Sequence, residues 1–134
     1  MQNTYFVSVI AAFAENPKIL ENMFINKESN KQGLFGVMIY KNGLKQQLLL
    51  DSYIPTKSGR PVFLRSNKSE VWQMLLDKAW AKVHGSYAKV QSGQPYEVFR
   101  DFTGAPGYYL KSNESGFWEA IQECVKDKYL IVAT

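Results

Sequence analysis

NTYFVSVIAAF, residues 3–13, decides how the rest of the chain is interpreted. From residue 5 to residue 14 the only polar residue is Ser8, so a helix over this run would carry apolar side chains on every side. A helix of that kind is buried on all faces. Asn3 or Thr4 can cap its N-terminus by accepting a hydrogen bond from a free backbone N–H, and the run is much shorter than the roughly 20 residues of a membrane span. The stretch therefore predicts the central helix of a folded domain.

The bulk composition is that of one globular domain. The chain has 134 residues, of which 46% are hydrophobic and 14% aromatic, enough for one packed core over residues 1–134. Its single cysteine, Cys124, excludes an internal disulfide and favours a reducing compartment. The first residues lack the basic and apolar regions of a secretory signal. These features predict a cytoplasmic protein with no membrane partner.

Positive charge is concentrated in one part of the chain. The formal net charge is +4, and between Lys27 and Lys68 eight Lys or Arg residues stand against only Glu28 and Asp51. The stretch Lys41–Lys68, called the basic region below, is either a solvated surface or a face for an acidic protein surface. The aromatic residues have the spacing of a core rather than of a nucleic-acid module, so nucleic acid is not an expected partner.

Two hairpins are expected in the first half of the chain. Residues 34–40 and 44–50 are strand-like and are joined by Asn42-Gly43, a pair that tolerates the positive φ of a tight hairpin turn. Residues 53–64 repeat the arrangement on a smaller scale, with prolines that keep them at a sheet edge. Together these runs predict a small antiparallel sheet.

The clearest helix lies in the middle of the chain. Asn67 and Glu70 form a capping-box pair at its start, and Gly85 can supply the left-handed residue that ends it. Between them one broad apolar stripe is expected to face the central helix, formed by Trp72, Leu75, Leu76, Ala79, Trp80 and Val83.

Three shorter helices and a terminal strand are also expected. Pro17 suits the first turn of a helix that ends near residue 24, and Pro95 suits the first turn of one that ends near residue 103. Ser115 is placed to cap a last helix, which carries Cys124 on its apolar side as a small buried residue. Leu130–Ala133 is predicted to be a buried strand.

Several of these segments resemble, in the same order, the core of calpain-type cysteine proteases. They are Asn3-Thr4-Tyr5-Phe6, Asp51-Ser52-Tyr53-Ile54-Pro55-Thr56, the helical run LLDKAWAKVHGSY (75–87) and Asp101-Phe102-Thr103-Gly104. The resemblance implies an α+β fold: the first, helical lobe of a papain-like cysteine protease, with a buried central helix and a small antiparallel β-sheet. It implies that residues 1–134 form this single lobe. The family's catalytic histidine and asparagine lie in a second lobe, expected to begin near the end of this sequence.

In the resemblance, Thr4 holds the position of the family's nucleophilic cysteine, so this chain is expected to have no catalytic residue. A threonine alkoxide is much harder to form than a thiolate, and a free N-terminal amine could serve as its base only if three residues were removed. The family's oxyanion glutamine would precede Met1, and Gln2 is too close to replace it. Thr4 is therefore interpreted as a cap or core residue.

The resemblance also assigns roles to residues other than Thr4, and two of these residues, Gly93 and Glu70, keep a second interpretation. Thr4, Tyr5 and Gly93 match the substrate cleft, and Gly93 suits a plain turn equally well. His84, the only histidine, matches a structural position at the end of a helix. Glu70 matches an acidic calcium ligand, but calcium requires six to eight oxygens and the family's partner ligands lie upstream of the nucleophile. A helix cap is the favoured role for Glu70, so no cofactor is expected and calcium is the alternative.

The sequence thus favours a catalytically inactive calpain-like domain, a pseudoprotease that serves as a structural or protein-binding module in a larger intracellular assembly. A protein partner or a second copy of the chain is expected to cover the cleft face, formed by Thr4, Tyr5, the turn at Ser92-Gly93 and residues 130–133. The alternative is a fragment, or one chain, of a calcium-dependent calpain-type cysteine endopeptidase.

Overall fold

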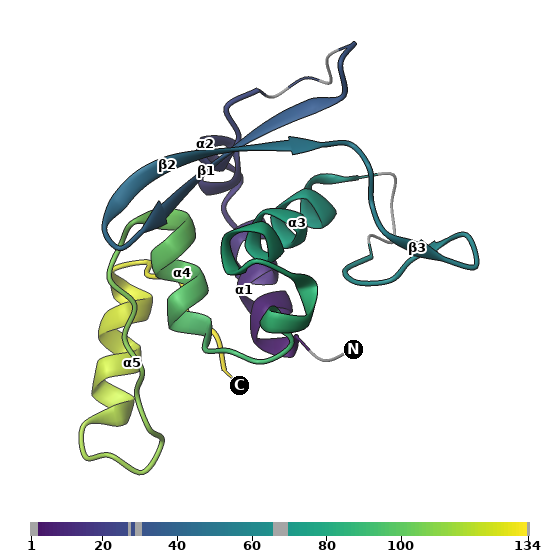
Figure 1. Cartoon of the computed structure of the whole chain (residues 1–134). Coiled ribbons are helices and arrows are strands. Elements are labelled where there is room, and N and C mark those ends of the chain that lie inside the picture. Colours follow the sequence, from purple (N-terminus) through teal and green to yellow (C-terminus); the bar gives the residue numbers. More distant parts are fainter. Residues whose placement is uncertain (1–2, 27, 29–30, 66–69, 134) are drawn as a thin grey trace.

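The computed structural model describes residues 3–26, 28, 31–65 and 70–133. A two-stranded sheet lies across one side of a group of helices, and α2, α3 and α4 contact it (Figure 1). In chain order the described elements are α1 (Thr4–Ala14), α2 (Pro17–Met23), β1 (Leu34–Lys41), β2 (Leu44–Asp51), β3 (Thr56–Lys57), β4 (Arg60–Pro61), α3 (Trp72–His84), the 3₁₀ helix η1 (Tyr87–Val90), α4 (Pro95–Thr103) and α5 (Phe117–Lys126).

Both predicted hairpins are confirmed. β1 and β2 pair antiparallel from Leu34 opposite Asp51 to Lys41 opposite Leu44. The turn residues Asn42 and Gly43 have φ angles of 52° and 76°, the left-handed conformation that a two-residue hairpin requires. The smaller hairpin pairs β3 with β4.

The central helix is α1, but the prediction that it is buried on all sides is wrong. Its large side chains enter the core, whereas Thr4, Ala11 and Ala14 are exposed and form one side of the helix. The difference arises because an alanine methyl buries little apolar area and therefore fits a surface as well as a core. The buried residues of α1 are Tyr5, Phe6, Val9, Ile10 and Phe13.

The long helix α3 is confirmed, and Gly85 ends it with a φ of 93°. Trp80 is 1% exposed, and its ring centroid lies 6.0 Å from that of Phe6 on α1. The predicted capping box at the start of α3 is wrong. The N-cap residue is Val71, and no side chain caps the helix. Asn67, the other member of the predicted capping box, lies outside the described residues.

The last part of the chain departs most from prediction. α4 ends at the left-handed Gly104 as expected, but α5 begins after Gly116, which is left-handed, and Ser115 does not cap it. Leu130–Ala133 is not a strand: no described strand pairs with it, and Ile131 is 44% exposed. An apolar run needs a partner strand to form a sheet, and neither sheet of the described residues includes residues 130–133.

The described residues therefore have the predicted α+β fold, with five α-helices and a small antiparallel sheet. No helix among the described residues is both long enough and apolar enough to cross a membrane.

Candidate functional site

Thr4 is the first residue of α1, and its side chain is exposed. Its interpretation as a core residue is wrong. The N-cap position belongs to Asn3, whose carbonyl accepts the backbone N–H groups of Phe6 and Val7 at 3.0 and 3.1 Å. The Thr4 hydroxyl thus stands at the positive end of the α1 dipole, a position that favours negative charge.

Tyr5 connects α1 to two other elements through its hydroxyl group. The hydroxyl accepts a hydrogen bond from the indole N–H of Trp80 at 2.9 Å and donates one to the carbonyl of Val90 at 2.9 Å. Both partners are buried, and burial raises the pKa of the Tyr5 hydroxyl above its ordinary value. The Tyr5 side chain therefore lies in the core. The prediction that Tyr5 forms part of an exposed cleft face is wrong.

Gly93 lies directly against the Tyr5 ring. A Cβ atom at Gly93 would stand 2.7 Å from Cζ of Tyr5, closer than van der Waals contact allows. The glycine is therefore required by close approach to the ring. Thr4, Tyr5 and Gly93 are thus brought together at the start of α1, and their role as a substrate cleft stays a prediction.

His84 is held within its own helix. Its Nδ1–H donates to the backbone carbonyl of Trp80 at 3.0 Å, and the two rings have centroids 4.1 Å apart. These contacts give His84 a structural role at the end of α3. Cys124 on α5 is a free thiol and is half-buried. No residue of α5 is fully buried, so the prediction that Cys124 is a buried residue is wrong.

Glu70 does not cap α3 with its side chain. Its carboxylate accepts hydrogen bonds from the indole N–H of Trp72 at 3.2 Å and from the amide of Gln73 at 3.4 Å. Calcium needs a shell of oxygen ligands, whereas the groups around Glu70 are N–H donors. The described part of the chain also holds no group of three His, Cys, Asp or Glu side chains suited to a metal ion. Glu70 is therefore bonded to two N–H donors in the described part of the chain, and the expected absence of calcium stays a prediction.

Two ion pairs connect the basic region to the helices that follow it. Lys41 forms an ion pair of 3.1 Å with Asp101, which is completely buried, and Lys78 pairs with Asp51. Within the described residues of the basic region, Lys45 is exposed and forms no ion pair. Lys68, the last residue of the region, lies outside the described residues. Asp101 neutralises Lys41, but Lys78 lies outside the basic region and neutralises Asp51 within it, so these two ion pairs leave the net charge of the region unchanged.

Sequence reasoning missed the buried carboxylate of Asp77. Asp77 is 2% exposed, and it accepts hydrogen bonds from the backbone N–H of Leu64 at 3.3 Å and the amide of Asn3 at 3.4 Å. Burial raises the pKa of Asp77 to about 6, although the Leu64 bond opposes this shift. Asp77 lies off the predicted apolar stripe of α3, so no local signal indicated its burial. It ties Asn3, the residue before Thr4, to α3.

Comparison with known proteins gives the family. A family model described as calpain family cysteine protease matches residues 1–134. Human calpain-12 is 31% identical over 138 residues, covering 98% of this chain and 19% of calpain-12. The human calpain-2 catalytic subunit is 32% identical over 133 residues, covering 95% of this chain and 19% of that protein.

A calpain-type cysteine protease of rice (Oryza sativa subsp. japonica) is 35% identical over 105 residues, covering 77% of this chain and 5% of the rice protein. The chain thus spans 19% of the length of the two human calpains. With the match over residues 1–134 and the α+β fold of a calpain core lobe, the chain belongs to the calpain family of cysteine proteases.

Proposed function

We propose that this calpain-family lobe is a catalytically inactive pseudoprotease, which serves as a structural or protein-binding module in an intracellular assembly. The observation that carries the proposal is the threonine at residue 4, exposed at the first position of α1. In the resemblance described above, that position belongs to the nucleophilic cysteine. No calcium-dependent step is part of the proposal.

The chemistry of the helix start supports inactivity. The N-terminus of a helix lowers the pKa of a cysteine thiol and so favours the thiolate. A threonine hydroxyl does not ionise under the same influence and needs an adjacent base. The hydrogen bond of the His84 ring runs to the carbonyl of Trp80 in its own helix and not to Thr4, so His84 is not the adjacent base. Thr4 therefore offers a hydroxyl for hydrogen bonding rather than a nucleophile.

The proposed module acts through the exposed side of α1. Thr4, Ala11 and Ala14 are exposed there, and Val7 is half-buried. Small side chains on one side of a helix let a second element approach closely, and apolar groups left in water favour association. We assign this side, with the exposed Ile131, to a protein partner or to a second copy of the chain. The unpaired lysines of the basic region are left for an acidic protein surface.

The test is the state of assembly, measured by size-exclusion chromatography with light scattering on the native protein. Thr4→Lys and Ile131→Glu should each weaken assembly, whereas Leu44→Glu, at a 67% exposed position on the hairpin, should not. Tyr5 is unsuitable for this test because its side chain is buried. A monomeric native protein, with no binding altered by Thr4→Lys or Ile131→Glu, would rule out the covered face.

A further inference from the structure

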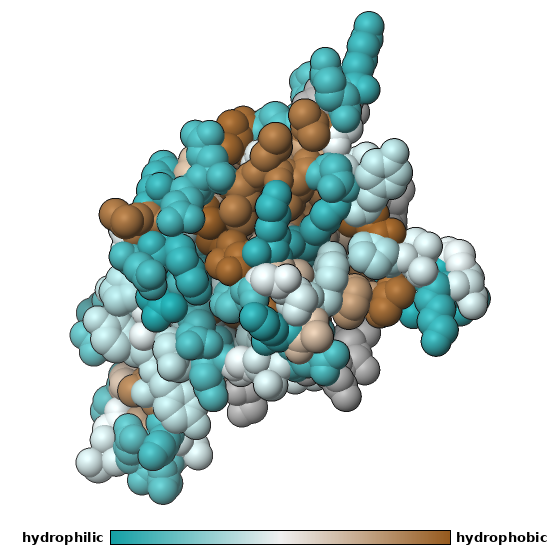
Figure 2. All heavy atoms as spheres, viewed as in Figure 1, coloured by the Kyte–Doolittle hydropathy of each residue, from teal (hydrophilic) through white to brown (hydrophobic). Residues whose placement is uncertain are grey.

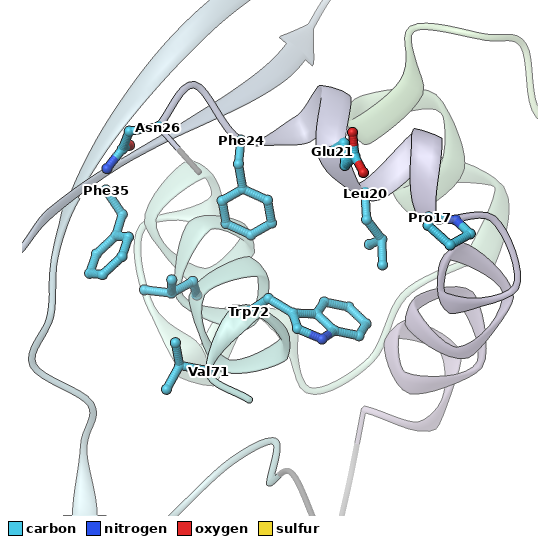
Figure 3. Close-up of a pocket in the computed structure, with 9 residues that line it drawn as sticks. Pro17, Leu20, Glu21, Phe24, Asn26, Phe35, Val71 and Trp72 are labelled. Atoms are coloured by element: carbon cyan, nitrogen blue, oxygen red, sulfur yellow. The ribbon is translucent and has the colours of Figure 1, made fainter. Parts of the chain in front are cut away.

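The β3–β4 hairpin projects from the side of the molecule (Figure 1). Residues 55–62 are called the arm below, and residues 57–60 are its tip. The two strands are joined by Ser58 and Gly59, whose φ angles of 52° and 73° are those of a tight two-residue turn. An apolar groove of about 480 Å³ lies between α2, β1 and the start of α3, and no arm residue lines it (Figure 3). The arm is therefore a separate surface feature.

The arm is held at its base by two contacts. The backbone N–H of Val62 donates to the carbonyl of Pro55 at 3.0 Å and closes the hairpin. Directly after the arm, the ring of Phe63 stacks on the ring of Tyr87 on η1, with centroids 3.9 Å apart and planes 3° from parallel. A two-stranded hairpin has little stability of its own. These contacts therefore fix the direction in which the arm presents its tip.

Two like charges stand opposite each other at the tip. Lys57 of β3 is the register partner of Arg60 of β4, and both residues are exposed. The side chains of directly opposite residues lie on the same face of a sheet, with Cβ atoms about 5 Å apart, and like charges there weaken the pairing. The arm therefore carries a local repulsion that an anion bound between the two side chains would remove.

No carboxylate side chain of the chain neutralises this pair. All 12 Asp and Glu residues lie within the described residues, and none of them forms an ion pair with Lys57 or Arg60. Residues 52–69 contain four Lys or Arg residues and no Asp or Glu. Asp51, which directly precedes this stretch, is paired with Lys78. The anion that suits the tip therefore has to come from another molecule.

An apolar surface lies beside the two charges on the arm. Alternate residues of a strand point to the same face, so Pro55 and Val62 share a face with Lys57 and Arg60. Pro55 is exposed, and Val62 is 44% exposed. In the view of Figure 1, Figure 2 shows strongly hydrophilic atoms at the end of the arm and hydrophobic atoms at its base. The arm thus offers positive charge at its tip and apolar area at its base.

This combination selects a carboxylate-bearing protein segment. The guanidinium of Arg60 can donate two parallel N–H bonds to one carboxylate, and the ammonium of Lys57 can neutralise a second. A free phosphate ion matches these charges but has no group to cover Val62. A peptide with an apolar residue beside its acidic residues satisfies both parts of the arm.

We infer that the arm binds an acidic segment of a protein partner, with carboxylates at Lys57 and Arg60 and an apolar side chain against Val62. The inference rests on the proposed function as a protein-binding module, and it identifies where the acidic partner is held. The arm is a different surface from the exposed side of α1, so the two contacts can be tested separately.

The test is the fluorescence anisotropy of a labelled, blocked peptide, Gly-Glu-Glu-Leu-Glu-Glu-Gly, titrated with the native protein at about 50 mM salt, where charges are weakly screened. A peptide with Gln in place of each Glu should bind about tenfold more weakly, because the ion pairs are lost. A peptide with Ser in place of Leu should bind about threefold more weakly. Inorganic phosphate at the concentration of the acidic peptide should not displace it.

Two double variants separate the arm from the rest of the surface. Lys57→Gln with Arg60→Gln should weaken binding of the acidic peptide about tenfold. The matched control is Lys126→Gln with Lys128→Gln, which removes the same charge at two other exposed positions and should change binding less than about twofold. Both variants alter exposed side chains only, so both should keep the melting temperature of the native protein.

Three results would overturn the inference: no binding of the acidic peptide by the native protein, equal binding of the Gln peptide, or equal losses in the two double variants. Displacement by inorganic phosphate would show that the tip takes phosphate, and the assignment to carboxylates would be wrong. If Thr4→Lys weakens assembly while the acidic peptide does not bind, the protein-binding function stands and only the role of the arm is wrong.

Discussion

The hydroxyl of Tyr5 is expected to contribute far more to stability than its few atoms suggest. Tyr5→Phe removes the oxygen that joins the Trp80 indole N–H to the Val90 carbonyl, with both bonds at 2.9 Å. Trp80 is 1% and Val90 2% exposed, so water cannot replace the hydroxyl without a rearrangement of the core. A buried polar group left without a partner costs about 1–3 kcal/mol. For two such groups the expected loss in the free energy of unfolding is about 2–6 kcal/mol.

Urea unfolding followed by circular dichroism measures this loss. With a slope of about 2 kcal/mol per molar urea, the midpoint should fall by about 1–3 M. Tyr53→Phe is the matched control, because the same atom is removed from a side chain that is 82% exposed, and its effect should stay within about 0.5 kcal/mol. Equal midpoints for Tyr5→Phe and Tyr53→Phe would refute the reasoning about the buried hydroxyl.

Three further predictions concern α3 and Glu70, which lies two residues before α3. Trp80→Ala should lower the free energy of unfolding by about 3–5 kcal/mol, as for large aromatic truncations in a packed core; an unchanged melting temperature would contradict this. Burial raises the pKa of Asp77 from 3.8 to about 6, so the native state holds more protons than the unfolded state between pH 4 and 6, and stability falls as the pH rises through that window. Asp77→Asn should remove this decline, roughly 2–3 kcal/mol, and melting curves of both proteins across pH 4–7 test it; parallel curves would contradict it. Calcium or a chelator should leave the melting temperature unchanged, whereas a rise with calcium that Glu70→Gln abolishes would show a calcium site.

Local patterns were sufficient for the elements whose ends are set by backbone chemistry. The hairpin at Asn42-Gly43 and the end of α3 at Gly85 were predicted because both require a positive φ, which few residue types accept. Leu130–Ala133 was mispredicted because pairing depends on a neighbouring edge, which a single apolar run does not encode.

The candidate site depended on contacts that no local pattern contains. The bonds from Tyr5 to Trp80 and Val90, and the approach of Gly93 to the Tyr5 ring, join residues far apart in the sequence. The same holds for the burial of Asp77. The order of motifs indicated the family, since such an order reflects the whole fold, but it could not indicate which side of α1 remains exposed.

The most direct test of inactivity is the cleavage of a fluorogenic, unstructured polypeptide by the native protein, with and without calcium, beside Thr4→Ala and Thr4→Cys. Thr4 is exposed, and among the described residues the hydrogen bond of the His84 ring runs to the Trp80 carbonyl rather than to Thr4. All three proteins are therefore expected to give the rate of the blank. Turnover by the native protein that Thr4→Ala abolishes, or turnover by Thr4→Cys that a thiol alkylator blocks, would contradict the assignment as a pseudoprotease.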